Sequence, residues 1–157
     1  MALRPGWLKR GTWQPGRTGS ASGTAMAIIQ CAVISTCAVR GLDYLRHDPD
    51  PSSVLSRVQD SAPLTWWGMF FIAAAIVAAA GLAGRWGAVA AIGHIMAMVA
   101  YAGIAFGLFL VTGLGPGVRT PWGLAMTAII HGALGIGIFA TIRRREMIAA
   151  LPPESLE

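Results

Sequence analysis

Charged residues are scarce in this chain of 157 residues: they make up only 12% of it, whereas apolar residues make up 55%. An ordinary soluble domain has about 25% charged residues. The net charge is +5, but the basic residues lie at the ends of apolar segments and form no stripe interleaved with stacking aromatic side chains. Nucleic acid is therefore excluded as a partner, and this placement is typical of a protein whose partner is a lipid bilayer.

Cysteines and catalytic motifs are also nearly missing. Cys31 and Cys37 are the only two cysteines; on one helix they point in different directions, so they cannot form a disulfide with each other. The sequence has no metal-type Cys/His spacing, no nucleophile elbow, no phosphate-binding glycine loop and no HExxH motif. It thus predicts no catalytic, cofactor-binding or metal-binding residues, and we expect a protein that is not an enzyme.

Long uncharged runs dominate the chain instead. They are Thr18–Val39, Ser61–Gly84, Trp86–Val118 and Thr120–Ile142. A helix of about 20 apolar residues crosses a hydrocarbon core about 30 Å thick, and each run is long enough to do so. The stretch "MFFIAAAIVAAAGLAG" in the second run has no polar face, which excludes a helix of a soluble bundle. The sequence therefore predicts an all-α integral membrane protein with four transmembrane helices.

The connections between the runs predict the topology. The segments "AGRWG" and "GLGPGVRTP" are short turns, so sequential helices are expected to be antiparallel neighbours in an up-down four-helix bundle. The expected segments are a basic cytoplasmic leader (1–21), a transmembrane domain (22–142) with helices at about 22–42, 64–83, 86–113 and 121–142 and an outer loop at 43–63, and a basic cytoplasmic tail (143–157).

The distribution of basic residues predicts the orientation. With the N-terminus inside, eight of the twelve Lys and Arg residues lie on the inner side. The positive-inside rule then places both termini in the cytoplasm, and the protein is expected to be a multi-pass protein of the inner (cytoplasmic) membrane. Its expected interface anchors are tryptophans beside the helix ends and arginines after the last helix: Trp66, Trp67, Trp86, Trp122, Arg143, Arg144 and Arg145.

Three polar side chains, Gln30, His94 and His131, interrupt the apolar runs. At a rise of 1.5 Å per residue they lie about 15, 12 and 16 Å from the inner border, which is one layer of the membrane. We expect them to hydrogen-bond in the bundle interior, directly or through water. Because ionisable groups inside a membrane are candidates for function, three interpretations remain open: a structural link between helices, a proton-sensing or proton-conducting group, and a pair of haem ligands.

Small residues at three- and four-residue spacing indicate close helix packing. Such residues let helix backbones approach one another in a membrane. They pack either within one chain or between copies, and we expect a homo-oligomer. The predicted packing residues are Gly93, Ala97, Gly103, Gly107, Gly132 and Gly135.

Four segments carry a resemblance to known proteins: "RPGWLKRGTWQPGR" in the leader, "RGLDYLR" at the end of the first helix, "PLTWWG" at the start of the second, and "RRRE" after the last. In these the chain resembles small four-pass membrane proteins of actinobacterial phages and prophages. The resemblance implies holin-like permeabilisation of the membrane during lysis, or exclusion of superinfecting phages with a cytoplasmic protein partner docked on the basic termini. A weaker likeness to DoxX-type four-helix proteins, through "GLAGRWGAVAAIG", implies a redox or proton-linked function.

Overall fold

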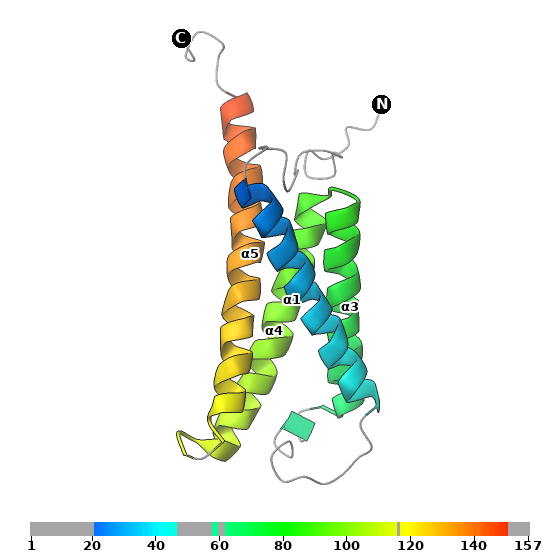
Figure 1. Cartoon of the computed structure of the whole chain (residues 1–157), viewed down its shortest axis with the longest axis vertical. Helices are drawn as coiled ribbons and strands as arrows, with labels where there is room; N and C mark the ends of the chain where they lie inside the picture. The colour runs from blue at the N-terminus through cyan, green and yellow to red at the C-terminus, as the bar shows by residue number, and fades with distance from the viewer. Residues whose placement is uncertain (1–20, 47–57, 60–61, 116, 151–157) are drawn as a thin grey trace.

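The computed structural model describes residues 21–46, 58–59, 62–115 and 117–150. Throughout these ranges the long elements are helices and none is a strand, and all four helices are long and apolar enough to cross a membrane. The predicted all-α membrane bundle is confirmed. The helices are α1 (Ala21–Arg46), α3 (Leu64–Ala83), α4 (Gly87–Thr112) and α5 (Arg119–Ala149) (Figure 1).

The first and last helices extend beyond their predicted spans. α1 reaches Arg46 rather than residue 42, and α5 runs from Arg119 to Ala149 rather than from 121 to 142. Arginine and glutamate are good helix formers, so the segment "RRRE" marks the end of the apolar span without ending the helix. Residues 1–20 of the predicted leader, most of the loop at 43–63 and residues 151–157 of the tail lie outside the described residues.

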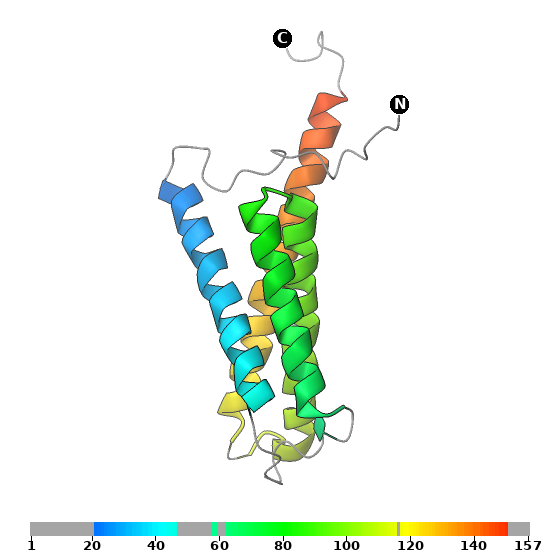
Figure 2. The same cartoon turned by 90° about the vertical axis from the view of Figure 1, so that its right-hand side faces the viewer.

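The helices follow one another around the bundle without closing a ring. α1 packs on α3, α3 on α4 and α4 on α5, whereas α1 and α5 hardly touch. We call the end that holds the start of α1 and the end of α5 the terminal end, and the opposite end the loop end (Figure 1). Figure 2 shows that α1 leans away from the other helices toward the terminal end.

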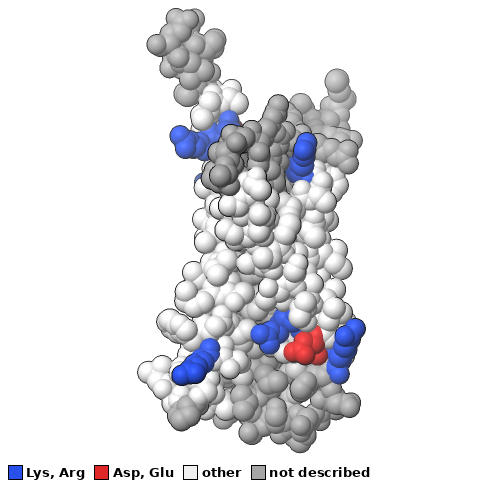
Figure 3. Space-filling view, in the orientation of Figure 1, with Lys and Arg blue, Asp and Glu red and all other residues white. Residues whose placement is uncertain are grey.

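The central band of the molecule carries no charge on the face shown in Figure 3, where charged side chains lie toward the two ends. α3 and α4 contain no charged residue over 20 and 26 residues, lengths of about 30 and 39 Å. Trp66 and Trp122 are exposed at the loop end, and Trp86 is half-buried at the terminal end. The indole of Trp67 is half-buried and packs on Gly103 of α4 instead of reaching outward.

Glycine allows the α3–α4 hairpin to pack closely. A Cβ atom added at Gly93 would collide with the backbone of Ala78, and one added at Gly81 would collide with the backbone of Ala90. α1 crosses α3 in the same way, because a Cβ at Gly68 would lie 2.9 Å from the Gly41 carbonyl oxygen. The contacts at Gly41 and Gly68 were not predicted from the sequence.

The other predicted packing residues also face parts of the same chain. Ala97 is buried in α4. Cβ atoms at Gly132 and Gly135 would meet the Met98 and Ile95 side chains. Gly103 and Gly107 do not face a helix backbone: their added Cβ atoms would lie 2.7 Å from the Trp67 ring and 2.6 Å from the Val58 side chain. Gly103 and Gly107 therefore leave room for bulky side chains of the same chain.

Candidate functional site

Two histidines meet inside the bundle. The Nδ1 atoms of His94 on α4 and His131 on α5 lie 2.9 Å apart, at hydrogen-bond distance. Both side chains are buried, with 0% and 1% of their surface exposed. They are neighbours because α4 and α5 pack along their length and both histidines lie on the packed faces.

This hydrogen bond fixes the roles of the four ring nitrogens. One ring donates through its Nδ1–H, and the other accepts at its bare Nδ1. In neutral imidazoles the donor ring then has an unprotonated Nε2, and the acceptor ring has an Nε2–H. Neither Nε2 atom has a hydrogen-bond partner in the described part of the chain. The pair thus presents one unused acceptor and one unused donor inside an apolar bundle, where an unmade hydrogen bond costs about 1–3 kcal/mol.

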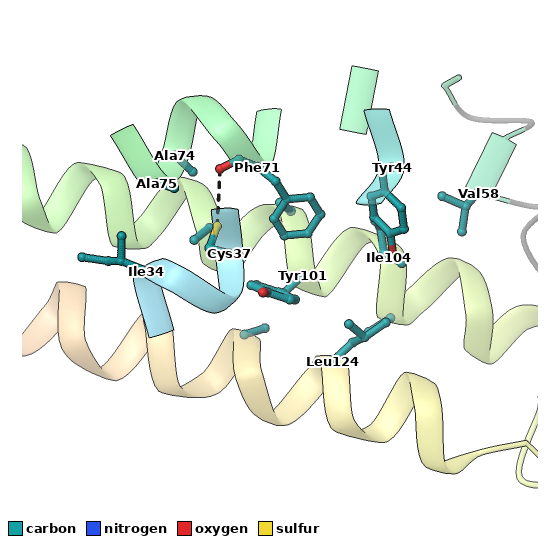
Figure 4. Packing of buried hydrophobic residues seen from close by; sticks show 14 of the residues in the cluster. Ile34, Cys37, Tyr44, Val58, Phe71, Ala74, Ala75, Tyr101, Ile104 and Leu124 are labelled. Atoms are coloured by element: carbon teal, nitrogen blue, oxygen red, sulfur yellow. Dashed lines mark hydrogen bonds between the residues drawn. The ribbon is translucent and has the colours of Figure 1, made fainter. Parts of the chain in front are cut away.

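Tyr101 extends the pair into a chain of rings. Its ring stacks on His131 with centroids 5.6 Å apart and an angle of 20°. Its other neighbour is Phe71, whose centroid lies 4.7 Å away at 72°, and Phe71 in turn contacts Tyr44 of α1 with centroids 5.9 Å apart. The Cys37 thiol donates to the Phe71 carbonyl oxygen at 3.4 Å (Figure 4). The ring chain therefore ties α1, α3, α4 and α5 together on the loop-end side of the histidines.

Gln30 is the third residue of the predicted layer, and α1 buries it to 2% exposure. Its Oε1 has no hydrogen-bond partner among the described residues, and the same holds for the Tyr101 hydroxyl. The structure therefore pairs the histidines with each other but leaves the Gln30 carbonyl oxygen out of the predicted hydrogen bonds. We use the name polar layer for Gln30, His94, Tyr101 and His131.

The backbone of α1 also comes close to the histidine pair. The backbone of Val33 approaches the His131 ring, although it does not provide a hydrogen-bond partner for His131 Nε2. This approach belongs to the sparse contact between α1 and α5. The helix that lies next to His131 on this side is therefore one that has little other contact with α5.

The two Nδ1 atoms are placed for a hydrogen bond, because they lie 2.9 Å apart. Two nitrogens that ligate one metal ion from opposite sides would lie about 4 Å apart, given metal–nitrogen distances of about 2.0–2.1 Å, so the Nδ1 atoms do not hold a metal ion between them in this arrangement. Within the ranges described, no group of three or more His, Cys, Asp or Glu residues could hold a metal ion.

Tyr101 was not predicted as a member of the polar layer, although three- and four-residue spacing places it on the same side of its helix as His94. Cys37 and Phe71 carried no such signal: the bond between them depends on where α1 crosses α3.

The fold and the polar layer define the class of this protein. It is a four-helix membrane protein that holds a hydrogen-bonded histidine pair inside the bundle. Comparison with protein-family models, with curated proteins and with solved structures finds no match for the chain.

Proposed function

We propose that this chain is a holin-like protein, which permeabilises the cytoplasmic membrane without enzymatic chemistry. The observation that carries the proposal is the polar layer, a set of buried side chains in the middle of four apolar helices whose polar atoms include several without a partner in the described part of the chain. The resemblance to four-pass phage proteins supports the same function. On this proposal both termini lie in the cytoplasm, as the distribution of basic residues favours, and the loop end faces outward.

The weak attachment of α1 supports a helix that can leave the bundle. Its span has the smallest buried share of the four. Between Thr24 and Thr36 only Gln30 and Ile34 are buried. When this half of α1 moves away, water reaches Gln30 and the histidines and supplies hydrogen bonds that the described residues do not make in the closed bundle. That gain offsets part of the free energy that α1 loses in packing.

The loop-end half of α1 is held more firmly and provides a pivot. The crossing at Gly41 and Gly68 brings two backbones together, and Cys37 and Tyr44 both contact Phe71 of α3. These contacts lie beyond Ile34 along the helix. We therefore expect α1 to swing about its loop-end half rather than to detach as a whole.

Association of several copies is needed to surround an opening, and α5 offers a free face for it. A Cβ atom at Gly123 or at Gly137 would meet nothing within 4 Å, so neither glycine is required for packing within this chain. Ile130 lies between them on the same side and is 42% exposed. A helix face with small residues lets a second helix approach closely in a membrane, and we place the contact between copies here.

Expression of the chain in bacterial cells tests this function. We expect the membrane potential, followed with a potential-sensitive dye, to collapse abruptly once the protein has accumulated. The double variant His94→Leu/His131→Leu is expected to fold, because both imidazoles are removed together and no buried ring nitrogen loses its hydrogen-bond partner. It should depolarise cells at least about tenfold more slowly, the effect of about 1.4 kcal/mol lost when two side chains no longer bind water.

The matched control is Ser35→Leu, which replaces an exposed polar residue of α1 by the same side chain. It is expected to depolarise cells like the unchanged protein. If cells that accumulate the unchanged protein in their membranes keep their potential, the proposal is wrong. A steady proton leak from the onset of expression, lost in the double histidine variant, would assign the chain to the proton-linked class instead.

One observation favours superinfection exclusion as a second candidate. α5 continues past the rest of the bundle at the terminal end (Figure 1) and exposes Arg143, Arg144 and Arg145 there. A projecting basic helix end suits the docking of an acidic cytoplasmic protein. In this case cells that express the chain would stay polarised and resist a challenging phage, and replacing the three arginines by glutamine would remove the resistance.

A further inference from the structure

An apolar groove runs along the outside of the α4–α5 pair in the loop-end half of the bundle. Its volume is about 390 Å³, within the range of small-molecule sites, about 300–1,000 Å³. The floor consists of the small buried residues Ala105 and Ala128, and the exposed side chains of Phe106 and Ile129 form its walls. Small residues between bulky ones make a channel that the chain's own side chains leave open.

The groove is as long as one leaflet of the membrane. It extends along α4 from Met98 to Phe109, which is about 16 Å at 1.5 Å per residue. Half of a hydrocarbon core about 30 Å thick is about 15 Å. Toward the terminal end the seam between the helices is filled, because Met98 lies over Gly132 and Ile95 lies against Gly135. A helix of a second copy would need a groove that continues through both leaflets. An acyl chain needs a groove in one leaflet only, which is the length observed.

The helix that forms one side of the groove begins with a positive charge. α5 begins at Arg119, six residues before the groove residue Ala125, which is about 9 Å along the helix axis. No acidic residue lies in the first turn of α5, so the arginine adds to the positive end of the helix dipole. Trp122 is 61% exposed and lies seven residues before Ile129, on the same side of α5. An aromatic ring and a cation at this depth are suited to the headgroup of a lipid.

From the length of the groove and the positive charge at the start of α5 we infer that the α4–α5 groove binds one anionic phospholipid, with an acyl chain between Phe106 and Ile129 and its phosphate near Arg119. The site requires a bilayer but does not depend on the proposed lytic function. Lipid in the groove would cover apolar side chains that the chain does not cover itself, and it would stabilise the α4–α5 pair through mass action.

Photo-crosslinking tests this inference on the full chain. The protein is reconstituted in phosphatidylethanolamine vesicles that contain phosphatidylglycerol with a diazirine on its acyl chain, and the labelled peptides are mapped after irradiation. Labels are expected on α4 from Met98 to Phe109 and on α5 near Ile129. Ala102→Phe narrows the groove, so that about two methylene groups of the acyl chain lose their burial. The weaker binding should reduce the labelling about tenfold.

Two further variants make the result decisive. Ala79→Phe adds the same ring at an exposed alanine of α3 and should leave the labelling unchanged. Arg119→Gln should reduce the preference for phosphatidylglycerol over phosphatidylcholine about fivefold, the effect of about 1 kcal/mol for one basic residue near a headgroup. Equal labelling of all lipid-facing helices, crosslinks to a second copy in place of lipid, or an unchanged headgroup preference in Arg119→Gln would each overturn the inference.

Discussion

Replacement of Gly93 by leucine is expected to destroy the folded bundle. A Cβ atom at this position would collide with the backbone of Ala78, and a backbone cannot move aside as a flexible side chain can. Overpacking of a buried contact commonly costs 1–3 kcal/mol. A leucine that forces apart α3 and α4, the helices that position His94, should lower the free energy of unfolding by about 3 kcal/mol or more.

Thermal unfolding in detergent, followed by circular dichroism, measures this effect. Gly137→Leu is the matched control, because a Cβ atom at this exposed position of α5 meets no described atom within 4 Å. This control should keep or slightly raise stability, since glycine in a helix interior is less stable than an ordinary residue by about 0.5–1 kcal/mol. Equal stabilities of the two variants would mean that α3 and α4 do not pack as the structure describes.

Replacement of Gly68 by leucine is expected to make the chain depolarise cells faster. A Cβ atom there would lie 2.9 Å from the Gly41 carbonyl oxygen and 3.0 Å from Leu45 Cγ, and both atoms belong to α1. The substitution therefore pushes α1 off α3 without touching the α4–α5 pair that holds the histidines. If release of α1 opens the membrane, this variant should depolarise cells earlier and at lower protein levels than the unchanged chain.

The expected change is at least about tenfold in the rate of depolarisation, because about 1.4 kcal/mol of packing between α1 and α3 is removed. Time courses at matched membrane levels give the measurement. Ala79→Leu adds a leucine at an exposed site on the same helix and should not change the onset. A delayed onset in Gly68→Leu would contradict the proposal that a looser crossing between α1 and α3 eases the swing of α1.

Much of the fold was predictable because lipid imposes simple constraints. α3 and α4 contain no charged residue over lengths that match the membrane, and the short turns that follow them leave only antiparallel packing. The two histidines were predicted to meet from their depth and from the helix faces on which they lie, and the structure brings their Nδ1 atoms to 2.9 Å. Helix rise and face periodicity suffice for such a prediction because α4 and α5 are straight neighbours.

The separation of α1 from α5 could not be predicted from the sequence. Short connections indicate which helices are neighbours, but they do not indicate whether the first helix also reaches the last. That depends on the crossing at Gly41 and Gly68, where two backbones approach at one point and direct the rest of α1 away. Gln30 shares the predicted depth of the histidines, yet its Oε1 has no partner among the described side chains. The depth of Gln30 in the membrane follows from the spacing of residues along the sequence. Whether its side chain reaches the histidines depends on how α1 crosses α3.

The most direct test of the account is the exposure of Gln30 to water when the membrane opens. Gln30→Cys is made in a chain whose native cysteines are replaced by serine, and a membrane-impermeant thiol reagent is added before and after depolarisation. Ile76→Cys, at an α3 residue that is 62% exposed on the apolar surface, is the control and should stay unlabelled throughout. The account predicts that the cysteine at position 30 is unlabelled before depolarisation and labelled after it. A cysteine that stays unlabelled in depolarised cells would contradict the claim that the polar layer lines the opening.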